Sequence, residues 1–145
     1  MKILAISDVP SKLLWDESVR KRLEGIDLIL SCGDLPKKYL EYLTNFTTVP
    51  ILYVHGNHDG SYKESEPGGC ICVDDAVYVW KGLRIMGLGG CNRYNRDDTF
   101  QYTEAEMRRR ARKLWLAARR AGMPRHPAST TAPTRPTRGF RYSTI

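Results

Sequence analysis

Three short apolar runs, each ending in small polar residues, are the feature that most constrains how this chain can fold. The runs are KILAIS before Asp8, DLILS before Cys32, and ILYV before His55. They are rich in Ile, Leu and Val and show no strict alternation of apolar and polar residues, which is typical of strands buried on both faces of a sheet. We therefore predict one strand for each run.

The segments between these runs place apolar residues at helical intervals. SVRKRLEG separates the first two runs, and PKKYLEYLTNF separates the second from the third. Pro36 can occupy the first turn of the second helix, where a missing N–H is tolerated. The order is therefore β-α-β-α-β, and strands joined by such crossovers run parallel with right-handed connections. The predicted fold class is α/β.

The rest of the chain predicts further strands, one long helix and a tail. Residues 70–90 read as short strands broken by turns, so we expect a β-meander that continues the layer into a mixed sheet. A helix is expected from a Thr-x-x-Glu capping box at Thr103 to Gly122. Its expected buried stripe is Met107, Ala111, Leu114 and Ala118. Residues 123–145 are rich in Pro, Thr and Arg, which predicts a disordered tail after a domain of residues 1–122.

Positive charge is concentrated near the C-terminus. The net charge is +7, but residues 1–103 hold 12 Lys and Arg against 14 Asp and Glu, whereas residues 104–145 hold 11 against 2. A basic nucleic-acid-binding module is therefore one hypothesis for the C-terminal stretch. The run Arg108 to Lys113 is more simply the solvated face of an amphipathic helix. We expect nucleic acid to be a partner only as a substrate.

Cellular location and cysteine use follow from the same sequence. The chain has no apolar stretch near the roughly 20 residues of a membrane-spanning helix, and its first residues lack the pattern of a signal peptide. We therefore expect a cytoplasmic protein with no membrane partner. The cysteines have no paired C-x2-C spacing, so we expect small buried side chains rather than a zinc knuckle or a disulfide framework. They are Cys32, Cys70, Cys72 and Cys91.

Polar side chains follow all three predicted strands. Asp8, Asp34 and Asn57 lie 26 and 23 residues apart, which is the spacing of successive β-α units. The carboxyl ends of parallel strands meet at one edge of a sheet, where open α/β folds place their ligand sites. Carboxylate and amide oxygens with nearby imidazoles suit a divalent cation. The alternative is helix capping and ordinary turn chemistry, which explains each segment singly but not all three in this order.

The ordered set of Asp8, Gly33-Asp34 and Gly56-Asn57-His58-Asp59 resembles the motifs of the calcineurin-like metallophosphoesterase family. The resemblance runs from Met1 to about Gly122 and implies the N-terminal part of that family's αββα sandwich. It implies two divalent metal ions (Mn, Fe, Zn or Mg), held by Asp8, by a bridging Asp34 and by Asn57. It also implies that His58 meets the phosphate of an ester substrate and protonates the leaving group, while a metal-activated water attacks. His55, by contrast, is expected to pack or bond locally.

Two departures from the family pattern affect the expected activity. The D-x-H motif is here Asp8-Val9-Pro10, and the later histidine motifs of the family have no match after Gly60, where only His126 remains. The domain is therefore expected to be incomplete, through truncation or a shifted reading frame, and its activity weakened.

Two further functions remain open beside the phosphoesterase. One is a catalytically inactive remnant that still binds metal or phosphate, and the other is the basic nucleic-acid-binding module described above. The sequence does not distinguish phosphate monoesters, diesters, nucleotides or protein phosphates as substrates. It does not define the oligomeric state either.

Overall fold

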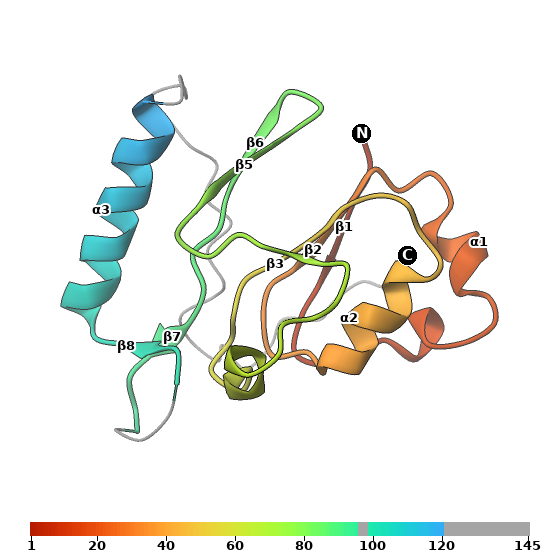
Figure 1. The fold of residues 1–145 in the computed structure, drawn as a ribbon, viewed down its shortest axis with the longest axis horizontal. Helices are drawn as coiled ribbons and strands as arrows, with labels where there is room; N and C mark the ends of the chain where they lie inside the picture. Colours follow the sequence, from red (N-terminus) through yellow and green to blue (C-terminus); the bar gives the residue numbers. More distant parts are fainter. Residues whose placement is uncertain (96–98, 121–145) are drawn as a thin grey trace, which may run out of the picture.

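A parallel sheet forms the centre of the molecule. The computed structural model describes residues 1–95 and 99–120. Four strands lie in the order β1-β2-β3-β4, and every neighbouring pair is parallel (Figure 1). Their bounds are Ile3–Ile6, Leu28–Ser31, Ile51–Tyr53 and Ile71–Cys72. The predicted α/β class and the parallel β-α-β-α-β order are confirmed.

Short helices form the crossovers between these strands. The 3₁₀ helix η1 and helix α1 connect β1 to β2, α2 connects β2 to β3, and the 3₁₀ helix η2 lies between β3 and β4. Pro36 directly precedes α2 with φ −60°, so its ring already has the helical torsion. The bounds are Lys12–Leu14 for η1, Val19–Leu23 for α1, Lys37–Thr44 for α2 and Gly60–Lys63 for η2.

The two faces of the sheet pack against different partners because successive side chains of a strand point to opposite sides. Ile29, Ile51 and Tyr53 pack with the buried side chains of η1, α1, α2 and η2. Leu28 and Leu52 pack on the other face, against Val73 and Ile85 and a hairpin described below. Strands β2 and β3 are therefore buried on both faces, as their continuous apolar sequences predict.

Strand β1 differs from this expectation. Leu4 and Ile6 pack on the helical side, whereas Ile3 is 42% exposed and Ala5 is exposed as well. β1 is an edge strand, and none of the described elements pairs with its outer side. Burial on both faces is thus wrong for β1, because the apolar run of an edge strand looks the same in the sequence as that of a central strand.

The strands after β3 do not form one continuous meander. β4 joins the parallel sheet, whereas β5 and β6 form a separate antiparallel hairpin, and β7 pairs with β8 in parallel. The expected meander is correct only for the hairpin. The bounds are Val77–Trp80 for β5, Leu83–Met86 for β6, Cys91–Asn92 for β7 and Gln101–Tyr102 for β8.

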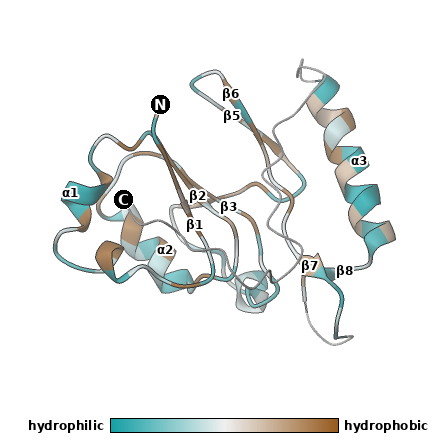
Figure 2. Ribbon diagram, turned by 180° about the vertical axis from the view of Figure 1, so that it is seen from behind, coloured by the Kyte–Doolittle hydropathy of each residue, from teal (hydrophilic) through white to brown (hydrophobic). Residues whose placement is uncertain are grey.

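Helix α3, Glu104–Arg120, lies on the side of the molecule away from α1 and α2, with the hairpin between (Figure 1). The capping box is confirmed: Thr103 donates N–H and O–H to Glu106, whose own N–H donates to the Thr103 hydroxyl at 3.3 Å. Leu114 and Ala118 are buried, and Met107 and Ala111 are half-buried. The exposed side chains of α3 are mostly hydrophilic (Figure 2), although Leu116 is 50% exposed. The expected end at Gly122 and the tail of residues 123–145 lie outside the described residues.

One arginine of α3 departs from the expected solvated face. Arg110 donates to both carboxylate oxygens of Asp75 at 3.0 Å and to the carbonyl of Gly89 at 2.8 Å. Its guanidinium lies 4.0 Å from the ring centre of Tyr102. Arg110 therefore joins α3 to two loops, the one between β4 and β5 through Asp75 and the one between β6 and β7 through Gly89. These contacts remove Arg110 from any basic surface. No helix in the described part of the chain is long and apolar enough to cross a bilayer.

Candidate active site

The strand register brings the predicted site residues to one edge of the sheet. Ile6 pairs with Ser31, and Ser31 pairs with Tyr53, so the three strands end in a single row. The loops that carry Asp8, Asp34 and Asn57 all leave from this row. Asp8 donates its backbone N–H to the carbonyl of Gly33 at 3.1 Å, which joins the first loop directly to the second.

The two aspartates that follow β1 and β2 share an unusual backbone conformation. Asp8 and Asp34 both have φ 59°, in the left-handed region that non-glycine residues seldom adopt. Aspartate and asparagine tolerate this region better than other side chains do. Such conformations persist where the surrounding structure imposes them, and they are concentrated at functional sites. The chain therefore takes the same unusual turn at both aspartates, shortly after each strand ends.

Two glycines allow the second and third loops to touch. A Cβ on Gly33 would lie 2.6 Å from the nitrogen of Gly56, and a Cβ on Gly56 would lie 2.1 Å from Oδ1 of Asp34. No side chain fits at either position without displacing the opposite loop. The G-D and G-N-H segments are therefore packed backbone to backbone, and Oδ1 of Asp34 accepts the N–H of His58 at 2.8 Å.

A buried carboxylate holds this contact together. Oδ2 of Asp59 accepts the N–H of Gly56 at 2.8 Å and the N–H of Asp34 at 2.9 Å. Asp59 is only 3% exposed, and burial raises the pKa of its carboxyl, although the two N–H groups oppose that shift. Asp59 is thus a positioning residue for the site. Asp59 is the last residue of the Gly56-Asn57-His58-Asp59 motif, but the sequence alone predicts no role for it.

The third loop directs the amide and the imidazole. Nδ2 of Asn57 donates to the hydroxyl of Tyr94 at 2.8 Å, which leaves the amide oxygen to act as a ligand. His58 is exposed, so its ring is accessible to a substrate. Tyr94 lies just after β7, and no signal in the sequence connected it with the site.

The carboxylates at this edge have no positively charged side chain paired with them within the described residues. None of the ion pairs formed there includes Asp8, Asp34 or Asp59. Asp8 is exposed and Asp34 is half-buried, so both carboxylates can be reached from solvent. Two accessible carboxylates and an amide oxygen form a donor set that suits a hard divalent cation.

A comparison with protein-family models decides the family. The model of the calcineurin-like phosphoesterase superfamily domain matches residues 1–123. The chain belongs to this superfamily. The resemblance predicted from the motifs is therefore confirmed. Membership of this superfamily supports a general metal-dependent phosphoesterase function, because its members are generally hydrolases of that kind. The comparison with curated proteins found no significant match.

The superfamily typically uses divalent metals, and the donors at the carboxyl edge fit such ions. Asp8, Asp34 and Asn57 would hold them. A different set of side chains, His55, Cys72 and Asp74, also brings potential ligand atoms within 4.8 Å of one another. His55 packs against aromatic rings, as expected, and stacks most closely on Phe100. Its 2.5 Å hydrogen bond is not local, because the partner, Asp74, is 19 residues away.

Removing the Asp59 carboxylate should destabilise the protein. Asp59→Ala would leave two buried backbone N–H groups without an acceptor, at a cost of about 1–3 kcal/mol for each. Asp59→Asn keeps an acceptor oxygen and should retain most of the free energy of unfolding. Urea denaturation followed by circular dichroism measures the difference. Equal stability of the two variants would show that Asp59 does not hold the loops together.

Proposed function

We propose that this chain hydrolyses a phosphate mono- or diester with two divalent metal ions at the carboxyl edge of its parallel sheet. The observation that carries the proposal is the direct contact between the G-D and G-N-H loops, in which Gly56 lies against the carboxylate of Asp34. This contact places a carboxylate, an amide oxygen and an accessible imidazole on adjoining loops. When bound, the metal ions would acidify a water molecule and neutralise phosphate charge.

Each proposed site residue has a separate task. Asp8 would hold one cation, Asn57 would hold the other, and Asp34 would contribute to both. Asp34 suits the shared position because its loop lies between the other two and is hydrogen-bonded to each. His58 donates a proton to the leaving oxygen of the ester, or a hydrogen bond to the phosphoryl group, as an imidazole can near neutral pH.

The number of ligands limits the expected rate. Asp8 and Asp34 supply two side-chain ligands to one ion, and Asp34 and Asn57 supply two to the other, whereas a catalytic zinc site usually has three. Pro10, at the position of the histidine in the family motif, has no ligand atom in its side chain. We therefore expect weak metal affinity and slow turnover that needs high Mn²⁺. A chain that binds metal without turnover is the second candidate function, and the same ligand count favours it.

The test is a hydrolysis assay on the purified full chain. Bis-p-nitrophenyl phosphate and p-nitrophenyl phosphate are incubated with the chain after chelation of metal, and again after Mn²⁺ is restored. We expect slow hydrolysis only with Mn²⁺. His58→Ala should lower kcat by about 10²-fold or more, the usual contribution of a general acid. His126→Ala is the control, since no motif includes that histidine.

Three outcomes of this assay are informative. Hydrolysis that persists without metal would contradict the proposal. Mn²⁺ binding by calorimetry without any turnover would favour the inactive metal-binding protein. Equal loss of activity in the two histidine variants would show that His58 has no special role.

A further inference from the structure

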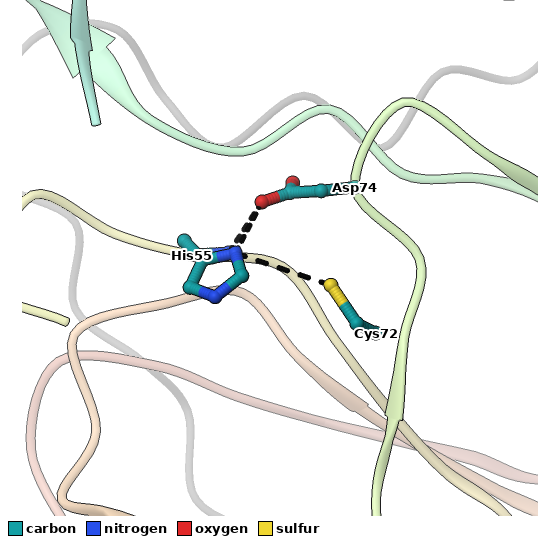
Figure 3. Close-up of side chains that lie close together, drawn as sticks. All are labelled: His55, Cys72 and Asp74. Carbon is teal, nitrogen blue, oxygen red and sulfur yellow. Dashed lines mark hydrogen bonds and ion pairs between the residues drawn. The ribbon is translucent and has the colours of Figure 1, made fainter. Parts of the chain in front are cut away.

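Three potential ligand atoms converge at the end of strands β3 and β4, beside the phosphoesterase loops. Tyr53 pairs with Cys72 in parallel register, so His55 and Asp74, each two residues farther along, also lie side by side. Nδ1 of His55 is 2.5 Å from Oδ2 of Asp74 and 4.0 Å from Sγ of Cys72 (Figure 3). The imidazole lies between the thiol and the carboxylate.

We propose that His55, Cys72 and Asp74 form a mononuclear zinc-type metal site, distinct from the oxygen-ligand centre at Asp8, Asp34 and Asn57. A thiolate and an imidazole favour Zn²⁺ and similar ions over Mg²⁺ or Ca²⁺. Water would occupy the fourth position of a tetrahedral ion. The proposal rests on this cluster alone and does not depend on the proposed hydrolase activity.

The distances are close to those that such an ion requires. Zinc bonds of about 2.3 Å to sulfur and 2.0 Å to nitrogen put neighbouring tetrahedral ligand atoms about 3.5 Å apart. The sulfur-to-nitrogen distance of 4.0 Å must shorten slightly, and the nitrogen-to-oxygen distance of 2.5 Å must lengthen by about 1 Å. Rotation of the short side chains of Cys72 and Asp74 can supply both changes.

A simple histidine–aspartate pair does not explain the environment of the second oxygen of Asp74, Oδ1. Oδ1 is buried and has no hydrogen-bond partner among the residues that the structure describes, although buried polar atoms are nearly always paired. It lies against Gly89, where a Cβ would come within 2.4 Å. The nearby Arg110 binds Asp75 instead. A divalent cation would balance the two negative charges of a thiolate and a carboxylate, and it would satisfy Oδ1 only if both oxygens of Asp74 bound it.

Aromatic side chains packed around His55 fix the orientation of its imidazole. The ring of His55 stacks on Phe100 with centroids 4.2 Å apart, and the edges of Tyr53 and Tyr62 close two other sides. Phe100 has φ 55°, which is an outlier for a bulky residue and is typical of a position that its surroundings impose. The imidazole is thus held with Nδ1 toward the other two ligands, as a preorganised site requires.

The nearest alternative is an ordinary buried hydrogen bond between His55 and Asp74. It accounts for the contact between Nδ1 and Oδ2, but it involves neither Oδ1 of Asp74 nor the thiol of Cys72, which instead hydrogen-bonds the backbone of Asp74 and interacts with the side chain of Tyr53. Metal binding would deprotonate the thiol, as it does at cysteine sites in general.

Cobalt(II) tests the site because a cobalt–thiolate bond gives a charge-transfer band in the near ultraviolet that oxygen ligands do not give. The reduced, metal-free full chain is titrated with Co²⁺. We expect the band to saturate at one ion per chain. Cys72→Ser should abolish the band, and His55→Gln should weaken Co²⁺ affinity by about tenfold or more.

Two control variants test whether the band comes from this site rather than from a neighbouring thiol or from the other metal centre. Cys70→Ser removes a half-buried thiol two residues away and should leave the band intact. Asp34→Asn should also leave it intact, because Asp34 belongs to the other centre. Absence of the band in the unmodified chain, or its survival in Cys72→Ser, would overturn the proposal. Loss of the band in Asp34→Asn would also overturn it, since the two centres would then not be distinct.

A second measurement avoids any dependence on the folding of a variant. The unmodified chain is alkylated with iodoacetamide with and without Zn²⁺, and the rate at each cysteine is followed by mass spectrometry. Zn²⁺ should slow the reaction at Cys72 by about tenfold or more and leave the rate at Cys70 unchanged. Equal rates at Cys72 in both conditions would overturn the proposal.

Discussion

Asp34→Asn is expected to lower Mn²⁺ affinity and phosphodiester hydrolysis more than Asp8→Asn does. Asp34 is the proposed shared ligand, so the substitution removes negative charge from both ions, whereas Asp8→Asn removes it from one. Loss of an outer-shell partner alone typically costs 10–100-fold in metal affinity or activity. We therefore expect at least about a hundredfold loss for Asp34→Asn. Isothermal titration with Mn²⁺ and the bis-p-nitrophenyl phosphate assay measure the two effects.

The two variants are well matched. Asp8 and Asp34 both have φ 59°, and asparagine tolerates this conformation as aspartate does. The amide oxygen of an asparagine at position 34 can still accept the N–H of His58. Differences in stability should therefore be small, and melting curves check this. Equal Mn²⁺ affinities for the two variants would contradict the assignment of Asp34 as the shared ligand.

The central fold could be predicted because its strands carry a strong local signal. Residues 28–30 and Ile51–Tyr53 are continuous apolar runs, and only a sheet covered on both faces buries such segments. The sequence pattern is less informative where a strand pairs with a partner that is distant in the sequence. Strand β4 has two residues, and nothing in its sequence shows that it joins β3 in parallel while β5 and β6 form a separate hairpin.

The residues of the candidate site could be predicted for the same reason. Asp8, Asp34 and Asn57 each follow a recognisable strand, and parallel strands bring such positions together. Asp74 and Tyr94 follow no comparable signal. Each hydrogen-bonds a residue that is distant in the sequence. Asp74 is 19 residues from His55, and Tyr94 is 37 residues from Asn57. The sequence predicts a solvated Arg110, which is wrong, because helical periodicity cannot reveal an acceptor such as Asp75.

The contact between the two motif loops is the structural element on which the candidate active site depends most. A Cβ on Gly56 would lie 2.1 Å from Oδ1, 2.3 Å from Cγ and 2.6 Å from the backbone nitrogen of Asp34. Asp34 cannot rotate away freely, because its N–H is held by Asp59 and its Oδ1 by the N–H of His58. An added methyl group must therefore move one loop relative to the other.

Gly56→Ala is expected to disrupt both stability and metal binding. Overpacking of this kind costs about 1–3 kcal/mol in the free energy of unfolding, and a displacement near 1 Å at a reacting centre costs on the order of a hundredfold in rate. Gly25→Ala is the control: its φ of +72° makes alanine unfavourable there, but nothing lies within 4 Å of the added Cβ. The control should lose stability while the folded protein keeps its Mn²⁺ affinity, measured by titration below the melting temperature of each variant. If folded Gly56→Ala binds Mn²⁺ as tightly as Gly25→Ala, the metal ligands do not depend on the contact between the loops, and the proposed centre is wrongly placed.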